Sequence, residues 1–543
     1  MEERVETVDR IDEIARESWE RSLGCDVADD TNFFEFGGDS ISAILMMSEV
    51  NAALGTSLSP HELFDAPDFG AFRALLRTES GAGADTGQAP REEPVAAGTT
   101  VTSLFQERWF GLSKERLGNV DVFFEVTGPL DPALFEQALE HLCRRHAVLR
   151  SVYEPGNPPV QRTVEDFRPR PRIQDLQGLP GDEVRAAVHA AVERSVRFFD
   201  LESEVPFELE LLTLSPTEHL IVGHLHHIAI DGWSIALLVD DLERVYHALE
   251  RGEDPAALEA APQYGDFAAR QRAYATGPGI EESREHWRSV FAGVGGPTRL
   301  PATVPPAADT GESSAYVNLL LDTGRADAVR AYAAAGRVTV YNVLLSAFAR
   351  LLAEITGTDD LLIGTSTAGR HGGADDHCLG VFITPMPLRI SLADADTADK
   401  LHAQVGDRMR DLAKHRMYPM ADLLRSVEPF RGKQLADLFA LHFIYQNQPQ
   451  PSAGNGRVYR QLDFQDAGLE RPHQLARPRS RVLRQLEVVV FDRLDGALSL
   501  NFAFDPARFA ESEVRGWLEA YGAHVDRLVG LAGLVGSTPA ERG

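Results

Sequence analysis

The sequence is short of cysteine, of basic residues and of long apolar runs. Its three cysteines in 543 residues include no CxxC pair, so neither a disulfide framework nor a cysteine-rich zinc site is expected. No run approaches the roughly 18 apolar residues of a membrane-spanning helix, and the charged N-terminus lacks the apolar core of a secretory signal. These absences predict a cytoplasmic protein without a membrane partner.

The shortage of positive charge excludes a further class of protein. The chain has 53 Lys and Arg against 82 Asp and Glu, a net charge of −29. Binding to nucleic acid needs clustered basic residues that neutralise phosphates, so no nucleic-acid partner is expected. The remaining composition, 43% hydrophobic and 25% charged, is ordinary for a folded chain long enough for several domains.

The first 78 residues show short helical patterns. Apolar residues recur at helical spacing over residues 6–23, and further patterns start near Ser40, near Leu58 and after Pro67. We therefore expect a small all-α four-helix bundle over residues 1–78. The next segment, 79–100, is rich in Gly, Ala and Pro and has no apolar period, which predicts a flexible linker.

From residue 101 the pattern becomes mixed α/β. The stretch "VDVFFEVTG" predicts a strand, and Asp131 is placed to cap the helix that follows. The pair "FELELLTL" and "HLIVGHLHH" predicts a hairpin, and "LEVVVFDRLDGALSLNFAF" predicts another that turns at Asp495-Gly496. The apolar "YNVLLSAFARLLAEITG" predicts a buried helix. A large α/β unit is expected here.

A serine stands at the start of the second helical pattern, in "FFEFGGDSISAILMM". Asp39 is a natural N-cap, and Ser40 then lies at a helix N-terminus, where free N–H groups and the helix dipole favour a phosphate ester. Taken alone, this stretch allows a simple capping role as well.

Two adjacent histidines interrupt an apolar run in "IVGHLHHIAIDGWSIALL", between a predicted strand and a predicted helix. His224 and His226 share one face of the strand, and His227 faces the other way. Such a cluster serves as core packing, as a metal site or in acid–base catalysis. No nearby carboxylate or cysteine completes a zinc pattern, so no metal is predicted.

Longer stretches around both features resemble known families. "FFEFGGDSISAILM", followed by "LSPHELFDAPDFGAFRALL", resembles the peptidyl carrier domains of nonribosomal peptide synthetases over residues 5–78. "HHIAIDGWS" resembles the HHxxxDG motif of condensation domains and of their chloramphenicol-acetyltransferase-type relatives. Six further motifs agree in order between residues 101 and 510: "SLFQERWF", "RRHAVLRSVY", "YGDFAARQ", "IGTSTAGR", "GVFITPMPLR" and "HRMYPMADLL".

Three departures from the condensation pattern lie in the later part of the chain. Thr384-Pro385 stands where the family has Asn-Thr, "RGKQLADLF" replaces RDxSRxPLF, and "RQLEVVV" replaces the usual FDLxL strand. These departures bear on substrate preference more than on the reaction.

The resemblance implies a two-lobed, chloramphenicol-acetyltransferase-like α/β fold, with an N-lobe over residues 101–275 and a C-lobe over 276–543. It implies that Ser40 carries 4′-phosphopantetheine, attached by a phosphopantetheinyl transferase and loaded through an upstream adenylation domain. The acyl group on this arm would pass to the amine of an aminoacyl group on a downstream carrier, forming a peptide bond. With no adenylation domain of its own, the chain resembles a fragment of a larger synthetase.

The resemblance also suggests roles around the histidines. His227 is expected to hydrogen-bond the attacking amine or accept its proton, and His226 to orient the loop. Asp231 is expected to form a structural ion pair with Arg150 of the "RRHAVLRSVY" motif. The N–H of Gly232 is expected to face the developing oxyanion.

Two alternatives remain open at this point: an epimerisation-type relative, and a catalytically silent condensation-like docking unit. Epimerisation relatives usually read HHxxxDxxSW, whereas this chain reads Asp231-Gly232-Trp233-Ser234-Ile235, which favours condensation. Heterocyclising relatives replace the histidines with aspartates, and this chain keeps both histidines. An intact HHxxxDG argues against the silent unit.

Overall fold

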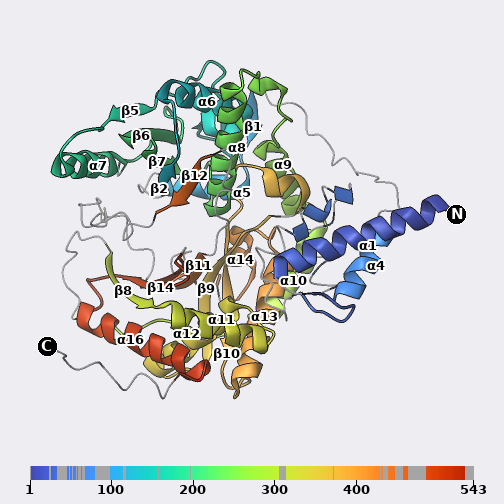
Figure 1. Ribbon diagram of the computed structural model, residues 1–543. Coiled ribbons are helices and arrows are strands. Elements are labelled where there is room, and N and C mark those ends of the chain that lie inside the picture. Colours follow the sequence, from blue (N-terminus) through green and yellow to red (C-terminus); the bar gives the residue numbers. More distant parts are fainter. Residues whose placement is uncertain are drawn as a thin grey trace.

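Figure 1 shows the computed structural model as a helical N-terminal unit beside two stacked α/β lobes. The described residues are 2–23, 26–33, 46–47, 49–51, 53–54, 56, 58, 63, 66, 68–79, 98–113, 118–156, 158–195, 197–304, 314–370, 372–428, 430–431, 438–446, 456–462, 485–493 and 495–531.

The N-terminal unit packs helix α1 (Glu2–Leu23) against α4 (Phe69–Glu79). Trp19 is fully buried, and its ring meets the ring edges of Phe33 and Phe69, each with centroids 5.2 Å apart. Helix α1 therefore confirms the first predicted helix, although it begins four residues earlier. Residues 46–47, 49–51 and 53–54 are helical, as predicted, whereas Ser40 and most of the third predicted helix lie outside the described residues.

The N-lobe is built on a five-stranded sheet in the order β12-β2-β7-β6-β5. Strands β6 and β7 form the predicted hairpin, and β7 also pairs antiparallel with β2. A small sheet in the order β1-β4-β3 lies in the same part of the chain. The bounds are β1 Thr99–Val101, β2 Asn119–Thr127, β3 Ser151–Glu154, β4 Val160–Thr163, β5 Arg172–Asp175, β6 Phe207–Ser215, β7 Glu218–His226 and β12 Val458–Gln461.

Helices cover both faces of the N-lobe sheet. Helices α6 and α8 share one apolar core with the inner faces of β2 and β7, and α7 packs on the opposite face of β7. The predicted cap is present, because the Asp131 carboxylate accepts the N–H groups of Ala133 and Leu134. Helix α10 already belongs to the C-lobe, where Trp287 joins the apolar core. The helices from residue 104 to residue 290 are α5 Leu104–Ser113, α6 Pro132–Arg145, η1 Ala147–Arg150, α7 Gly181–Ser195, α8 Gly232–Glu250, η2 Pro255–Ala257, α9 Tyr264–Thr276 and α10 Gly279–Val290.

The C-lobe is built on a six-stranded sheet in the order β10-β9-β11-β13-β14-β8. The predicted β13–β14 hairpin turns at Asp495-Gly496, where Gly496 has a φ of +83°, a conformation that favours glycine. Among the described residues, strand pairs β9–β11 and β11–β13 are parallel and the other neighbours are antiparallel. The bounds are β8 Ala315–Leu321, β9 Asp360–Thr367, β10 Thr384–Ser391, β11 Leu441–Gln446, β13 Leu486–Asp492 and β14 Leu498–Phe504.

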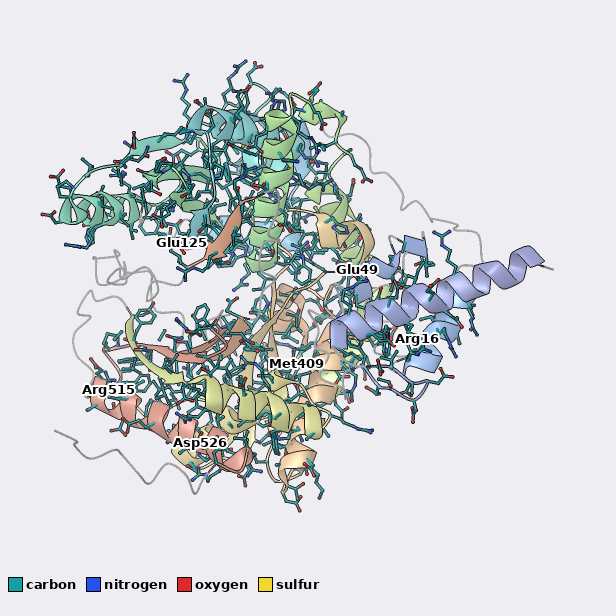
Figure 2. All side chains as sticks on the ribbon, viewed as in Figure 1. Arg16, Glu49, Glu125, Met409, Arg515 and Asp526 are labelled. Atoms are coloured by element: carbon teal, nitrogen blue, oxygen red, sulfur yellow. The ribbon has the colours of Figure 1, made fainter. Side chains whose placement is uncertain are left out.

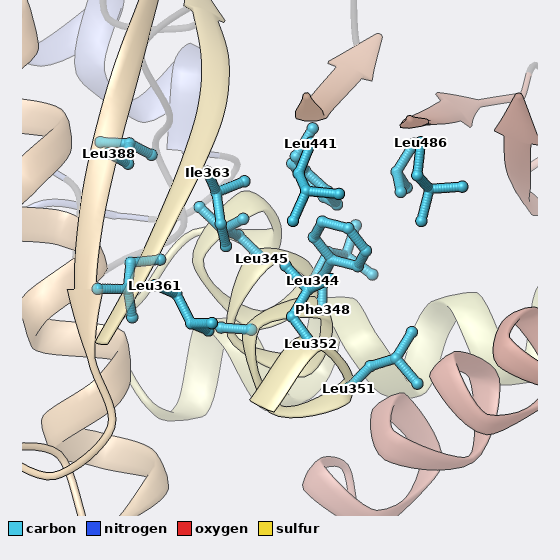
Figure 3. Close-up of a cluster of buried hydrophobic side chains, with 14 of the residues drawn as sticks. Leu344, Leu345, Phe348, Leu351, Leu352, Leu361, Ile363, Leu388, Leu441 and Leu486 are labelled. Carbon is cyan, nitrogen blue, oxygen red and sulfur yellow. The ribbon is translucent and has the colours of Figure 1, made fainter. Parts of the chain in front are cut away.

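The predicted buried helix is α12, and it forms the centre of the C-lobe core. Figure 3 shows Leu344, Leu345 and Phe348 of α12 beside leucines of β9, β10, β11 and β13. The C-lobe helices are α11 Thr323–Ala335, α12 Val340–Thr356, η3 Gly373–His377, α13 Ala398–Lys414, α14 Met420–Ser426 and α16 Glu511–Leu528. No single described helix has the length and hydropathy of a membrane span. Among the described helices, only α11 and α12 taken together meet both criteria, and the two helices are bent by 105° relative to each other.

Strand β12 crosses from the C-lobe to the edge of the N-lobe sheet. Its neighbour Arg457 is 1% exposed and donates to Glu243 (Nε–Oε2, 3.0 Å) and Glu250 (Nη2–Oε2, 2.8 Å) of α8. Arg460 of β12 pairs with Glu125 of β2, which Figure 2 labels at this edge. The predicted boundary between the lobes at residue 276 therefore does not hold for this segment, which belongs to the N-lobe sheet. A strand of four residues carries no sequence pattern that shows which sheet it joins. Strand β1 likewise includes Thr99 and Thr100 of the expected linker.

Candidate active site

The histidine cluster lies in a tight turn between β7 and α8. Strand β7 ends at His226, and α8 begins at Gly232 with Asp231 as its N-cap. The Asp231 carboxylate accepts the Ser234 N–H at 2.9 Å, which closes the first turn of the helix. The sequence therefore places His227 at the end of a strand, on a turn held at both sides by regular structure.

His227 is partly exposed, and its ring is held in one orientation. Its Nδ1 lies 3.2 Å from the Ile230 carbonyl, which only accepts, so Nδ1 carries the proton. In the neutral ring the lone pair is then on Nε2. The ring stacks on Trp109 of α5, with centroids 4.6 Å apart and planes 20° from parallel. A fixed, partly exposed imidazole of this kind is suited to accept a proton or orient an amine.

His226 is 1% exposed and belongs to the turn itself. Its Nδ1 accepts the Ile228 N–H at 3.0 Å, and the backbone N–H of His227 donates to the Gly118 carbonyl at 2.6 Å. Gly118 has a φ of +109°, and a Cβ there would come within 2.5 Å of the His226 ring. Only glycine allows this close approach. The geometry agrees with an orienting role for His226, which stays a prediction.

His224, on the same face of β7 as His226, forms a buried pair that the sequence analysis missed. Its Nδ1 lies 3.0 Å from Asp121 Oδ1 on the neighbouring strand β2, and its ring stacks on Phe199 at 4.4 Å. Asp121 and His224 are directly opposite in the β2–β7 register. That register could not be read from a single sequence, although the alternation of polar and apolar residues in both strands was visible.

Asp231 does form a buried ion pair, but its partner is Arg370 and not Arg150. Arg370 Nη2 lies 3.1 Å from Asp231 Oδ1, and both side chains are nearly inaccessible. The other carboxylate oxygen accepts the Phe382 N–H at 2.9 Å. Arg370 and Phe382 lie in the connection between β9 and β10, so this carboxylate ties the β7–α8 turn of the N-lobe to the C-lobe.

Arg150 binds elsewhere, which corrects the predicted pairing. Its Nε donates to the Cys143 carbonyl at 3.0 Å and its Nη1 to the Val164 carbonyl at 3.1 Å, with Glu165 at 3.5 Å. These contacts join the end of α6 to the segment after β4. Arg150 thus makes its contacts within the N-lobe and not at Asp231. The sequence offered both Arg150 and Arg370 inside motifs, and only the fold shows that Arg370 is the cation buried against Asp231.

Helix α5 packs against the β7–α8 turn. Ser103 and Gln106 form a reciprocal cap, in which Ser103 N–H donates to Gln106 Oε1 and Gln106 N–H donates to Ser103 Oγ. The Gln106 amide also lies 3.4 Å from the Ile228 carbonyl in the turn. The "SLFQERWF" motif therefore fixes the start of α5 and sets Trp109 against His227.

A buried carboxylate lies next to the Asp231–Arg370 pair. Asp376 of η3 is 2% exposed, and its carboxylate faces the Gly372 backbone N–H and the charge of Arg370. Its backbone carbonyl accepts from Trp233 Nε1 at 3.2 Å, so η3 contacts the first turn of α8. Burial raises the pKa of Asp376 to about 7, Arg370 opposes this rise, and the charge of Asp375 adds to it.

This pKa predicts that the contribution of Asp376 to stability falls as the pH rises from about 4 to about 7. The unfolded chain releases the Asp376 proton near pH 4, whereas the folded protein holds it until about pH 7. Asp376→Asn should thus match the parent near pH 4 and exceed it above pH 7, by at most about 4 kcal/mol. Thermal unfolding at pH 5 and pH 8 measures the difference, with exposed Asp327→Asn as control. A pH-independent difference would contradict the prediction.

The remaining site residues are placed as follows. Gly232 is the first residue of α8, where backbone N–H groups have no partner within the helix, and its role toward an oxyanion stays a prediction. Ser40 lies outside the described residues. Within the described part of the chain, no three His, Cys, Asp or Glu side chains are grouped to hold a metal ion.

Comparisons with known proteins agree with this geometry. Residues 98–531 match the condensation domain family, and residues 13–76 match the phosphopantetheine attachment site family. Surfactin synthase subunit 1 of Bacillus subtilis (strain 168) is 28% identical over 78% of this chain, and tyrocidine synthase 3 of Brevibacillus parabrevis is 29% identical over 80%. The chain spans only 12% and 6% of the length of these two relatives.

Solved structures share the fold. The first condensation domain of the calcium-dependent antibiotic synthetase, in complex with a substrate analogue, matches with a TM-score of 0.64 at 20% identity, over 82% of this chain and 98% of that one. The epimerization domain from the third module of tyrocidine synthetase B matches with a TM-score of 0.67 at 17% identity, over 82% and 99%.

The chain belongs to the condensation domain family, whose members are typically acyltransferases of nonribosomal peptide synthesis. A phosphopantetheine attachment domain precedes the condensation domain, the carrier-then-condensation order of nonribosomal peptide synthetases.

Proposed function

We propose that this chain forms peptide bonds by transferring an acyl group from its own carrier to the amine of an aminoacyl group on a second carrier. The observation that carries this proposal is the fixed, partly exposed His227 ring at the β7–α8 turn. That turn is tied to the C-lobe through Asp231 and Arg370, so both lobes hold the reacting region in place.

The reaction is aminolysis of a thioester. The amine nitrogen attacks the thioester carbonyl, the C–N bond forms, and the C–S bond breaks. The nitrogen loses one proton, and the departing pantetheine thiolate gains one, so no further reactant is needed. His227 accepts or orients that proton through Nε2, and alignment of two tethered substrates contributes much of the rate.

The second carrier and the loading enzymes are the partners that this function requires. An aminoacyl carrier downstream supplies the amine, an adenylation domain upstream activates the amino acid, and a phosphopantetheinyl transferase attaches the arm. Joining donor carrier and condensation domain in one chain makes their encounter intramolecular, with an effective concentration that reaches about the millimolar range.

Mass spectrometry of carrier-bound products tests this function. The chain is loaded with an aminoacyl pantetheine, mixed with a separately loaded acceptor carrier, and the acceptor is expected to gain the donor acyl mass. A change in donor configuration without amide formation would indicate epimerisation. Intact loaded carriers with no new product would indicate a docking unit, and either result would overturn the proposal.

Ser40 is expected to be the sole attachment point of the arm. Incubation with a phosphopantetheinyl transferase and coenzyme A should add one arm to the parent and none to Ser40→Ala, as measured on the intact protein. Ser57→Ala, a serine of the same carrier outside the Gly-Gly-Asp-Ser motif, serves as control and should load normally. Normal loading of Ser40→Ala would refute the assignment.

A further inference from the structure

One cation beside Trp109 has no counter-charge among the residues that the structure describes. Arg108 follows Glu107 on α5, and its guanidinium carbon lies 5.5 Å from the Trp109 ring centroid. The same ring stacks on His227 with centroids 4.6 Å apart. The guanidinium carbon of Arg108 therefore lies at most about 10 Å from the centre of the His227 ring, because the Trp109 ring is within 5.5 Å of the first and 4.6 Å of the second.

Three other arginines among the described residues near this site have partners. Arg272 of α9 donates to Glu107 at 2.9 Å, Arg370 pairs with Asp231, and Arg150 donates to two backbone carbonyls. Within the described residues, Arg108 has neither a hydrogen bond nor a carboxylate within salt-bridge distance, and its Nε is buried without a partner.

Burial has a measurable consequence for this group. It lowers the pKa of Arg108 to about 10, and no acidic neighbour raises it back. The guanidinium is nevertheless charged at neutral pH. A desolvated cation without an anion is costly, and this cost is relieved when a negatively charged oxygen arrives in the site.

We propose that Arg108 binds a negatively charged oxygen of the substrate during acyl transfer. The proposal rests on the proposed function, and it adds to it an electrostatic residue on α5. The phosphate of the pantetheine arm is not this anion, because it lies at the opposite end of the arm from the thioester that reaches His227.

Two sources share this chemistry. When the amine attacks, the thioester C=O becomes a tetrahedral oxyanion, whose charge returns to the carbonyl when the C–S bond breaks and the thiolate leaves. A fixed cation stabilises this intermediate more than the neutral thioester. The second source is a carboxylate on the side chain of one of the joined residues, which Arg108 would bind in the ground state as well.

Single-turnover amide formation distinguishes the two sources. Arg108→Met is expected to lose about 10²–10³-fold in rate, the usual cost of one oxyanion donor, and Arg108→Lys to lose less. A loss that is equal for neutral and acidic aminoacyl groups assigns the oxyanion. A loss confined to acidic groups, seen in the acceptor concentration that gives half the maximal single-turnover rate more than in that maximal rate, assigns the carboxylate.

Control variants distinguish the proposed anion-binding role of Arg108 from a purely structural role. Arg272→Met removes a paired cation that contacts the same helix, and it should lower Tm while leaving the rate near that of the parent. Guanidinium at millimolar concentration should restore rate to Arg108→Ala, and Ser40 loading should be normal in every Arg108 variant. Parent-like rates in both Arg108→Met and Arg108→Ala would overturn the proposal.

An anion titration keeps this test independent of the proposed function. Acetate should change the fluorescence of Trp109, taken as the difference between the parent and Trp109→Phe, and Arg108→Met should abolish that change. If the parent forms no amide, the proposed function fails, and the acetate response alone decides on Arg108. Absence of that response in the parent would then overturn the Arg108 proposal too.

Discussion

His227→Ala is expected to lower the single-turnover rate of amide formation by about 10²–10⁴-fold, the contribution of a positioned acid–base group. Folding and Ser40 loading should be unchanged, because the His227 side chain is partly exposed and its hydrogen bond to the Ile230 carbonyl lies at the surface of the turn. A loss in rate of only about 10²-fold would indicate that His227 orients the amine and does not take its proton, since the thioester is already activated.

His226 provides the matched control for this experiment. Its ring is buried and accepts the Ile228 N–H, so His226→Ala should lower Tm together with activity. If both substitutions destabilised the protein and activity fell in proportion, the pair would be core packing. Inhibition by a chelator would indicate a metal site. A parent-like rate in His227→Ala would show that His227 is not required, and backbone N–H groups near Gly232 would then be the groups that promote the reaction.

The elements of this fold were predictable where the signal is local. The Asp131 cap, the β6–β7 hairpin and the β13–β14 turn each depend on residues that are neighbours in the chain. Strand β12 was not predicted as part of the N-lobe sheet, because its place depends on Arg457 reaching Glu243, more than two hundred residues earlier.

The site was predictable to the same extent. The turn that carries His226, His227 and Asp231 lies in one short stretch, and the strand-to-helix pattern located it. The partner of Asp231 lies 139 residues away in the other lobe, and nothing in the spacing of the chain distinguishes Arg370 from Arg150. Arg108 was part of the "SLFQERWF" motif, but that it meets no counter-charge in the described part of the chain is visible only in three dimensions.

The Asp231–Arg370 pair gives the largest expected effect on stability. Asp231→Ala leaves the Arg370 guanidinium buried without its carboxylate, and breaking a buried pair on one side costs about 3–5 kcal/mol. Activity should fall as well, because the Ser234 and Phe382 N–H groups lose their acceptor and the β7–α8 turn loses its tie to the C-lobe. Unfolding monitored by calorimetry measures the first effect, and single-turnover kinetics the second.

A double-mutant cycle identifies the partner. Asp231→Ala combined with Arg370→Met should cost less than the sum of the two single changes, because removing both charges leaves neither unpaired. Asp231→Ala combined with Arg150→Met should be additive, since Arg150 binds the carbonyls of Cys143 and Val164 instead. Coupling to Arg150 would restore the pairing expected from the sequence motif. An Asp231→Ala variant that is inactive but as stable as the parent would place this carboxylate in the chemistry, since a buried structural partner cannot be removed without loss of stability.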